Sequence, residues 1–341
     1  MEVSLDNNNE NKQISMDQAL EKIEGDINKA VNSIRIASVS LLSCYTENAS
    51  SVEEFTKLRR SVTTTAKIYC NYVMPFSGLV IRNIKSFLED YIDFTLEEFE
   101  EYLDDKKSDA EQYGKLCQYT LELHQNLLTD FFKTQSDALE VCKILKLKCK
   151  EFETERVKLK HKHDVAAGVA IGLAMIPYVN LIASPAIGYL ANEWKKKSIA
   201  RKEESFIAAA AASCINDYLI SSIQEYIVAM TEISGFFKVM EGDLSTLVEH
   251  HEHDKIKKHY IKVKAISKRI IESCDSYTRS IPECEASLKA INNDYDSNYV
   301  QKWFRMTKNK KGQTLLEMGK ELSQYNNKII GIFGNMNITV N

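Results

Sequence analysis

The sequence predicts an all-α fold, an elongated antiparallel bundle of long, coiled-coil-like helices with an apolar helical hairpin near the middle of the chain. Three observations lead to this fold class. Only 12 glycines and 4 prolines occur in 341 residues, about half and about a quarter of their average usage, so tight turns are few. Apolar residues recur every three or four positions over several long stretches. One long interval has no charged side chain, although 27% of the chain is charged.

Composition excludes some classes of function. The formal net charge of −4 gives no basic surface for nucleic acid. The sequence has no phosphate-binding loop, no dinucleotide fingerprint, no HExxH zinc motif and no nucleophile elbow. We therefore expect no enzymatic activity, no cofactor and no metal site. Residues 1–14 are polar and read as a disordered leader without a Sec-type signal, so we expect a protein that is soluble before it meets a membrane and is released by a non-classical route.

The first helix is expected from about residue 17 to 46. Ser15 and Gln18 form a capping-box pattern before it. Its apolar positions are spaced by three and four and are Ala19, Ile23, Ile27, Ala30, Ile34 and Ala37. A second helix, capped by Ser51 and Glu54, is expected to end at Pro75. A third is expected over residues 79–104, where the acidic run 96–101 forms a solvated face.

The longest helix is expected from Ser108, with Glu111 as its capping partner, to Asp164. Its heptad seam comprises Ala138, Cys142, Leu145, Cys149, Phe152 and Leu159. A second seam comprises Tyr226, Met230, Ile233, Phe237, Met240, Leu244 and Leu247. A third seam is expected to end at Pro282 and comprises Ile256, Tyr260, Val263, Ile270, Cys274 and Tyr277. Shorter helices are expected over 283–293 and 314–326. Residues 15–164 and 193–328 thus form one bundle, and 329–341 form an apolar tail that docks on it.

The uncharged interval runs over residues 165–192, between the two longest seams. Pro177 near its centre predicts a hairpin with arms 165–175 and 181–192. The residues expected to insert into a membrane are Val165, Ala166, Val169, Ala170, Ile171, Leu173, Ala174, Met175, Ile176, Pro177, Tyr178, Val179, Leu181, Ile182, Ala183, Pro185, Ile187, Tyr189 and Leu190. Lys160, Lys162, Trp194, Lys195, Lys196 and Lys197 are expected at the membrane interface, where basic and aromatic side chains meet headgroups.

Two interpretations of this interval remain open. Arms of 10 to 14 residues are more often core helices than membrane spans. A thin rod of helices, however, has little room to bury a tip that is apolar all round, and the basic flanks favour insertion. A single-span anchor fits less well, because Pro177 would fall in mid-span.

A long helix, an apolar hairpin and a long return helix resemble the cytolysin A (haemolysin E) superfamily of α-helical pore-forming toxins. The layout is most similar to the smaller component of the binary XaxAB and YaxAB type. The resemblance implies a pore-forming subunit that inserts residues 165–192 into a target-cell lipid membrane. It also implies a homo-oligomer, with a second helical toxin component as a candidate partner. The alternative is a non-enzymatic helical scaffold or adaptor whose hairpin is buried core or a membrane tether.

Other clusters have simpler interpretations. Residues 249–254 read Glu-His-His-Glu-His-Asp, and the pairs Glu249 with His253 and His250 with Asp254 could share a metal if they lay four apart on one helix. A solvated polar turn is the favoured interpretation. A pH-sensing role for this run, or for His161 and His163, is a hypothesis. Cys142 and Cys149 read as small buried apolar residues.

Overall fold

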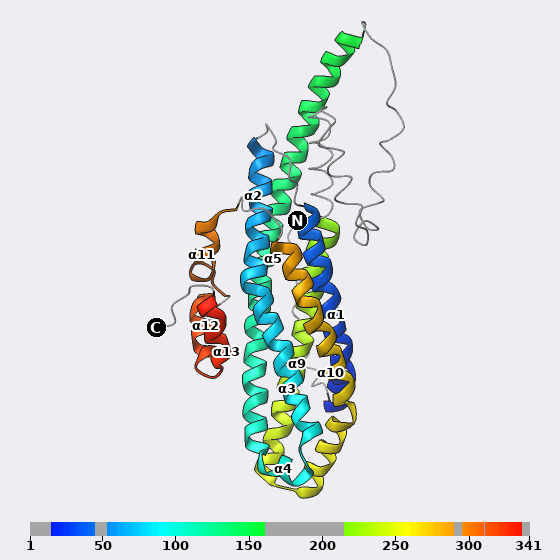
Figure 1. Ribbon diagram of the computed structural model, residues 1–341, viewed down its shortest axis with the longest axis vertical. Coiled ribbons are helices and arrows are strands. Elements are labelled where there is room, and N and C mark those ends of the chain that lie inside the picture. The colour runs from blue at the N-terminus through cyan, green and yellow to red at the C-terminus, as the bar shows by residue number, and fades with distance from the viewer. Residues whose placement is uncertain (1–14, 45–52, 161–214, 290–294, 310, 336–341) are drawn as a thin grey trace.

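A computed structural model describes residues 15–44, 53–160, 215–289, 295–309 and 311–335. Over these residues the protein is all-α, as the sequence predicts, and its only β-type pairing is an isolated bridge between Lys308 and Thr314. The elements, in chain order, are α1 (Met16–Cys44), α2 (Glu53–Ile68), the π-helix η1 (Tyr69–Val73), α3 (Met74–Asp93), α4 (Leu96–Glu101), α5 (Leu103–Lys160), the π-helix η3 (Ile215–Ile220), α9 (Ser221–His250), α10 (His253–Lys289), α11 (Ser297–Met306), α12 (Leu315–Ser323) and α13 (Asn327–Asn335) (Figure 1).

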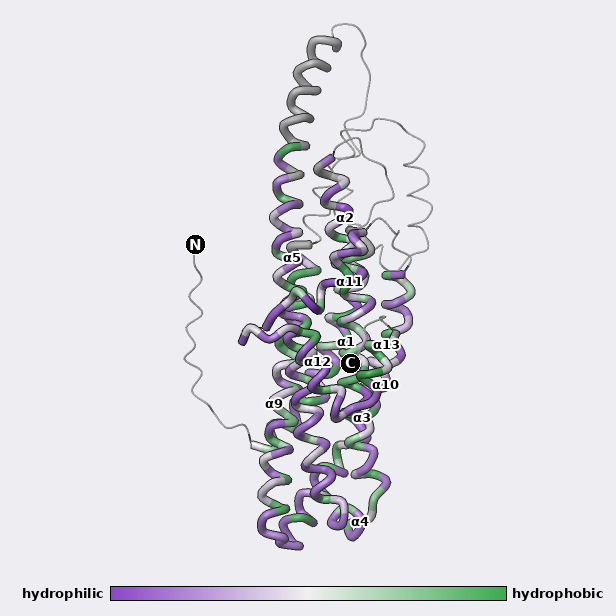
Figure 2. The backbone as a smooth tube through the Cα atoms, turned by 90° about the vertical axis from the view of Figure 1, so that its left-hand side faces the viewer, coloured by the Kyte–Doolittle hydropathy of each residue, from purple (hydrophilic) through white to green (hydrophobic). Residues whose placement is uncertain are grey.

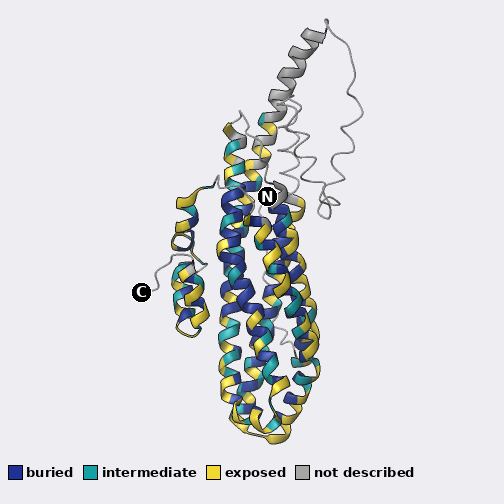
Figure 3. Cartoon of the chain, viewed as in Figure 1, coloured by how far each residue is buried: buried dark blue, intermediate teal, exposed yellow. Residues whose placement is uncertain are grey.

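The long helices α1, α3, α5, α9 and α10 pack side by side along one axis (Figure 1). Helices α1, α5 and α10 run in one direction, and the α2–η1–α3 column and α9 run in the other. Buried residues follow the centre of this bundle, and exposed residues follow its outside (Figure 3). Hydrophobic and hydrophilic residues alternate along each helix of the bundle (Figure 2). The result is an elongated bundle with one continuous core.

The predicted helix start and three predicted seams are confirmed. The Ser15 backbone N–H donates to Gln18 Oε1 at 3.1 Å, and the Gln18 N–H donates to Ser15 Oγ at 3.3 Å, so the capping box opens α1. All the predicted apolar positions of α1, α9 and α10 are buried. The seam predicted from Ala138 to Leu159 is not tested, because its side chains lie outside the described ones, although the backbone of α5 is helical through Lys160.

Pro75 does not end a helix, contrary to the prediction. The chain passes from α2 through η1 directly into α3, and Pro75 occupies the first turn of α3. Proline lacks an N–H and cannot donate to the turn before it. At η1 the ladder widens, because the Met74 N–H donates to the carbonyl of Tyr69, five residues earlier. The column therefore continues past the proline with buried residues on both sides.

A helix break was missed at Phe94 and Thr95. Phe94 is extended, with ψ 147°, and ends α3 at Asp93 rather than at residue 104. Thr95 caps α4 with a capping box in which Thr95 Oγ1 accepts from the Glu98 N–H at 3.2 Å. The acidic run therefore forms its own short helix, anchored by the buried Phe99. Helix α5 begins at Leu103, five residues before the predicted start.

Pro282 also lies within a helix, where the sequence predicted an end. Helix α10 continues through it to Lys289. Pro282 itself is exposed, whereas Cys284 and Leu288 beyond it are buried. Packing of these two residues against the core outweighs the hydrogen bond that proline cannot donate.

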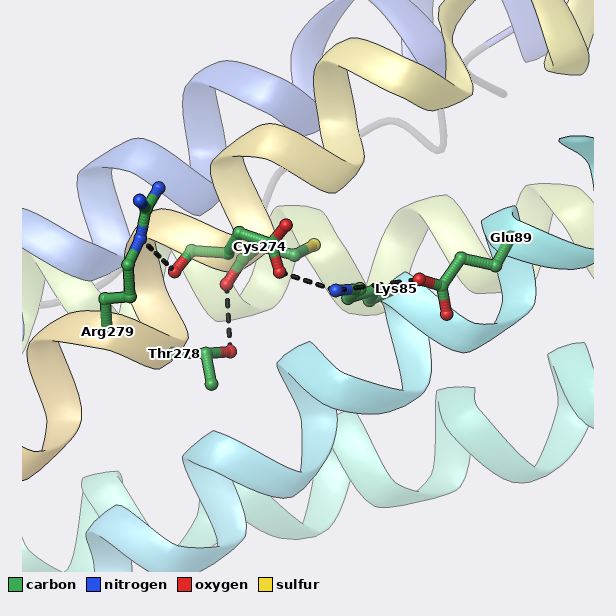
Figure 4. Close-up of polar contacts among 6 residues, drawn as sticks. Lys85, Glu89, Cys274, Thr278 and Arg279 are labelled. Carbon is green, nitrogen blue, oxygen red and sulfur yellow. Dashed lines mark hydrogen bonds and ion pairs between the residues drawn. The ribbon is translucent and has the colours of Figure 1, made fainter.

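Polar contacts on the outside of the bundle connect neighbouring helices. Figure 4 shows Lys85 of α3 reaching toward Glu89 on its own helix and toward α10. Lys85 Nζ lies 2.6 Å from Asp275 Oδ1 and 3.6 Å from Glu89 Oε1. The neighbouring Cys274 is fully buried, and burial raises the pKa of its thiol to about 12. A thiol in that state is a packing group rather than a nucleophile.

Candidate membrane-inserting segment and the helices that carry it

Most of the predicted site lies outside the described residues. This holds for all the residues predicted to insert, 165–192, and for Lys162 and residues 194–197 of the predicted interface. Lys160 is the last residue of α5. The structure instead describes the two helices on either side of this part of the chain, α5 before it and η3–α9 after it.

Helices α5 and α9 place both ends of residues 161–214 toward the same end of the rod (Figure 1). Helix α5 has 58 residues, which corresponds to about 85 Å. It runs the whole length of the bundle and extends beyond the other helices (Figure 1). Helix α9 returns antiparallel to it and ends at the two-residue connection to α10 at the opposite end.

The interface between α5 and α9 is tightly packed because of one glycine and one aromatic stack. A Cβ on Gly114 of α5 would lie 3.5 Å from Phe237 Cβ of α9, so the backbones approach closely there. About three turns further along α5, the His124 ring stacks on Tyr226 with 4.0 Å between the ring centroids. The pair of helices is thus joined over much of its described length.

His124 is an unusual group for the centre of a helical bundle. It is fully buried, and its Nδ1 bonds the Thr120 carbonyl oxygen at 2.8 Å. Its Nε2 is buried and has no hydrogen-bond partner among the described residues. Tyr69 of η1 meets the ring edge-on, at 6.1 Å between centroids. Burial lowers the pKa of the imidazole to about 3, against a smaller opposing effect of the Thr120 carbonyl.

Tyrosine side chains make the core around His124 partly polar. The Tyr226 hydroxyl lies 3.4 Å from the Tyr277 hydroxyl of α10, and the buried Tyr69 hydroxyl has no partner among the described residues. Burial raises the pKa of all three phenols. We call His124, Tyr69, Tyr226 and Tyr277 the polar layer. It is neutral at physiological pH.

Helices α11–α13 form a C-terminal clasp on the side of α2 and α5 (Figure 1). The Trp303 Nε1–H donates to Asp130 Oδ2 of α5 at 3.0 Å, and the Tyr299 hydroxyl donates to Asp130 Oδ1 at 3.2 Å. An aromatic cluster surrounds this contact and comprises Tyr72, Phe76, Tyr119, Trp303, Phe304 and Phe333. The sequence did not predict α11. The predicted tail begins within α13, and two of its residues, Ile329 and Phe333, are buried.

The opposite end of the rod is held by a second buried histidine, His259 of α10. Its Nδ1 lies 2.5 Å from Asp243 Oδ2 of α9, and its Nε2 lies 2.9 Å from the Tyr91 hydroxyl of α3. Phe99 of α4 stacks on the ring, 5.9 Å between centroids. We call Tyr91, Asp243 and His259 the end clamp, because they join three helices beside the α9–α10 connection.

The run at residues 249–254 is an exposed polar turn, which confirms the favoured interpretation. Helix α9 ends at His250, and His251 adopts a left-handed conformation with φ 48°. Because the helix ends there, Glu249 and His253, and likewise His250 and Asp254, do not lie four apart on one helix. His253 Nδ1 instead lies 3.0 Å from Glu100 Oε1 of α4. The described residues contain no group of three side chains arranged to hold a metal.

Three groups near the candidate site were missed from the sequence. His124 and Asp130 lie in an α5 segment that reads as an ordinary amphipathic helix, and Trp303 lies in a short helix that was not predicted. The only usable signal was an isolated histidine at an apolar position of the helix, which is most often a core residue with satisfied hydrogen bonds. Within the described residues, no helix is both long enough and apolar enough to cross a bilayer.

Comparisons with known proteins give a weak likeness in fold. The sequence matches no family model and no curated protein. Among solved structures, the chain is similar to the soluble AhlB of the tripartite alpha-pore forming toxin AHL from Aeromonas hydrophila, with 14% identity, a TM-score of 0.42, and coverage of 91% of this chain and 100% of that chain. A likeness at this level does not assign a family, and the function proposed below rests on the residues of this chain.

Proposed function

We propose that this protein is a subunit of an α-helical pore-forming toxin that inserts residues 165–192 into a target membrane. The observation that supports this most is an uncharged 28-residue interval in the sequence between two antiparallel, tightly packed helices, α5 and α9, whose ends nearest to it in sequence lie toward the same end of the rod. Exposed apolar surface costs about 25 cal/mol per Å² in water, and a bilayer removes that cost. An apolar interval at the end of a rigid rod can therefore reach a membrane while the rest of the chain stays in water.

An oligomer follows from the chemistry of the interval. Its hydrogen-bonding side chains are few: Tyr178, Asn180, Ser184, Tyr189 and Asn192. One copy offers too few polar groups to line an aqueous channel, so the proposed pore is a ring of copies, with a second helical component as a candidate partner. Lys160, Lys162 and Lys195–Lys197 would meet anionic headgroups, at about 1 kcal/mol for each basic residue near the surface.

The decisive experiment measures dye release from liposomes by the purified protein. The variant carries Ala174→Asp and Leu181→Asp, and its matched control carries Val228→Asp and Ile261→Asp, two apolar residues of α9 and α10 that are 56% and 54% exposed. Both variants gain the same charge. We expect the first to lose release and the second to retain it, with equal helicity by circular dichroism. Full release by the first variant would contradict insertion of residues 165–192.

Tryptophan quenching tests the interface separately. The chain has two tryptophans, and Trp303 is buried in the clasp. Brominated lipids are expected to quench the fluorescence of the membrane-bound protein, and Trp194→Phe is expected to remove that quenching. A protein that never sediments with vesicles, alone or with a candidate partner, would instead be a helical scaffold or adaptor.

A further inference from the structure

We propose that acidification loosens the bundle selectively around the polar layer at His124 and leaves the end clamp at His259 intact. The two buried histidines respond to a proton in opposite ways because their partners differ. The loosened half is the one that leads to residues 161–214. This inference concerns the stability of the rod and stands whether or not the protein forms pores.

A proton on His124 meets no anionic partner within the part of the chain that the structure describes. The groups that face the ring are Tyr69 from η1 and Tyr226 from α9, and Tyr277 of α10 lies behind Tyr226. Within α5, Nδ1 is already occupied by the Thr120 carbonyl oxygen, so the added proton would reside on the buried Nε2. Cys117, about two turns earlier on α5, is a buried thiol that is neutral, because burial raises its pKa.

The stacked Tyr226 ring offers the charged imidazolium only a cation–π contact, which is weaker than the loss of hydration for a fully buried ion. Protonation of His124 in the folded protein is therefore unfavourable. This agrees with the direction of the pKa, which burial lowers to about 3.

A proton on His259 has an anionic partner in place. Asp243 of α9 lies against Nδ1, so protonation turns this hydrogen bond into an ion pair. The Tyr91 hydroxyl of α3 can accept from the new Nε2–H without moving. The other charged groups around this site are Lys262 of α10, which lowers the pKa of Asp243, and Asp90 of α3, which raises the pKa of Tyr91. Phe99, the contact from α4, carries no charge.

The position of each histidine sets where the rod opens. His124 joins the middle of α5 to Tyr226 of α9, five residues after the start of α9 at Ser221. Separation at this layer frees the parts of α5 and α9 nearest residues 161–214. His259 lies near the α9–α10 connection, and its contacts hold α3, α9 and α10 together at the other end.

Linkage gives the size of the effect. A histidine with a pKa near 6.5 in the unfolded chain and about 3 in the folded chain stabilises the fold above pH 6.5, and this stabilisation is lost as pH falls toward 3. Between pH 7.5 and pH 5, the unfolding constant is expected to rise about 30-fold because of His124 alone. The other histidines add their own dependence, so a variant is needed to isolate this contribution.

The test compares urea unfolding of the full chain and of His124→Phe at pH 7.5 and pH 5. Phenylalanine keeps an aromatic ring against Tyr226 and cannot be protonated. We expect the pH-dependent change in the unfolding constant to be about 30-fold smaller in His124→Phe than in the wild type. His250→Gln, at an exposed position of the polar turn, is the matched control and should keep the wild-type dependence. Equal dependence in wild type and His124→Phe would overturn the proposal.

Two measurements on the wild type keep the proposal open to refutation if the variant does not fold. Hydrogen exchange, corrected for the intrinsic effect of pH, should rise at pH 5 over residues 117–131 and 219–233 and stay low over 87–103 and 240–262. In addition, the NMR signals of the His124 ring should remain those of the neutral form at pH 5. Equal loss of protection at both ends, or titration of this ring near pH 6.5 in the folded protein, would contradict the inference.

Discussion

The indole of Trp303 donates to the Asp130 carboxylate across 3.0 Å, and this hydrogen bond joins the clasp to the helix that leads to the apolar interval. The Asp130 side chain is only partly accessible, and Trp303 and Tyr299, which donate to its carboxylate, are both neutral. Burial therefore raises the pKa of the carboxyl group, and the two hydrogen bonds offset part of that rise. The clasp thus covers a carboxylate that would be better hydrated without it.

Because of this hydrogen bond, the stability of the clasp should depend on the Nε1–H donor of Trp303. Trp303→Phe keeps the aromatic packing and removes the donor, so we expect it to lower the free energy of unfolding by about 1.5–3 kcal/mol. Asp130→Asn is the control, because its amide oxygen can still accept from the Trp303 indole and its amide NH2 can donate to the Tyr299 hydroxyl, without the cost of a partly buried charge. It should be neutral or stabilising. Denaturant unfolding at pH 7 measures both, and equal destabilisation by the two variants would contradict this account of the contact.

Gly319 allows the close approach of α12 to its neighbours. A Cβ at this position would overlap the Phe333 ring of α13 and would lie 2.9 Å from the Tyr119 hydroxyl of α5. Gly319→Ala should therefore cost about 1–3 kcal/mol and expose α12–α13 to proteases. Gly331→Ala is the control in α13, where a Cβ meets nothing within 4 Å. It should be tolerated, since alanine is the better helix former. Equal resistance of both variants to proteases would show that position 319 tolerates the added methyl group.

Lys106 neutralises two aspartates where α3 and α5 meet. Its Nζ lies 2.5 Å from Asp90 Oδ2 and 2.6 Å from Asp109 Oδ2, and its side chain is 6% exposed. Lys106→Met would leave two carboxylates facing each other, so we expect a loss of about 3 kcal/mol at pH 7. The exposed Lys115–Glu111 pair provides the comparison, because Lys115→Met should cost less than about 1 kcal/mol.

The end clamp predicts a coupling between two residues. His259→Phe leaves the buried Tyr91 hydroxyl without its acceptor, which should cost about 1–3 kcal/mol. In the Tyr91→Phe background the same change should cost less, because no hydroxyl remains to be left unsatisfied. A double-mutant cycle by thermal or denaturant unfolding measures this difference. Additive losses would mean that the two side chains do not act through their hydrogen bond.

The parts of the fold that followed from the sequence are those governed by periodicity. Tyr226, Phe237 and Leu247 are buried as predicted, because spacing by three and four specifies one face of a helix. The helix ends were harder to predict. Pro75 and Pro282 were predicted to end helices. The π-helix η1 lets the chain stay helical up to Pro75, and core packing outweighs the hydrogen bond that Pro282 cannot donate. The end at Phe94 has no proline or glycine and depends on the Thr95 capping box.

The candidate site was predictable in composition but not in its surroundings. The uncharged interval is visible in the sequence itself, and its insertion stays a prediction, since residues 165–192 lie outside the described ones. The polar layer could not be foreseen. Whether His124 faces solvent or core depends on the rotation of α5 against α9, and a polar residue gives no periodic signal.

Three ion pairs tie the first three turns of α1 to neighbouring helices. Asp17 pairs with Lys262, Lys22 with Glu232, and Glu24 with Arg269, at side chains that are largely open to water. Beyond them, Ile34, Ala37 and Leu41 hold the helix by apolar burial. Added electrolyte weakens attraction between solvated charges and leaves hydrocarbon packing almost untouched. At molar salt concentrations, α1 should therefore fray from its amino-terminal end while its carboxyl-terminal half stays packed on the bundle.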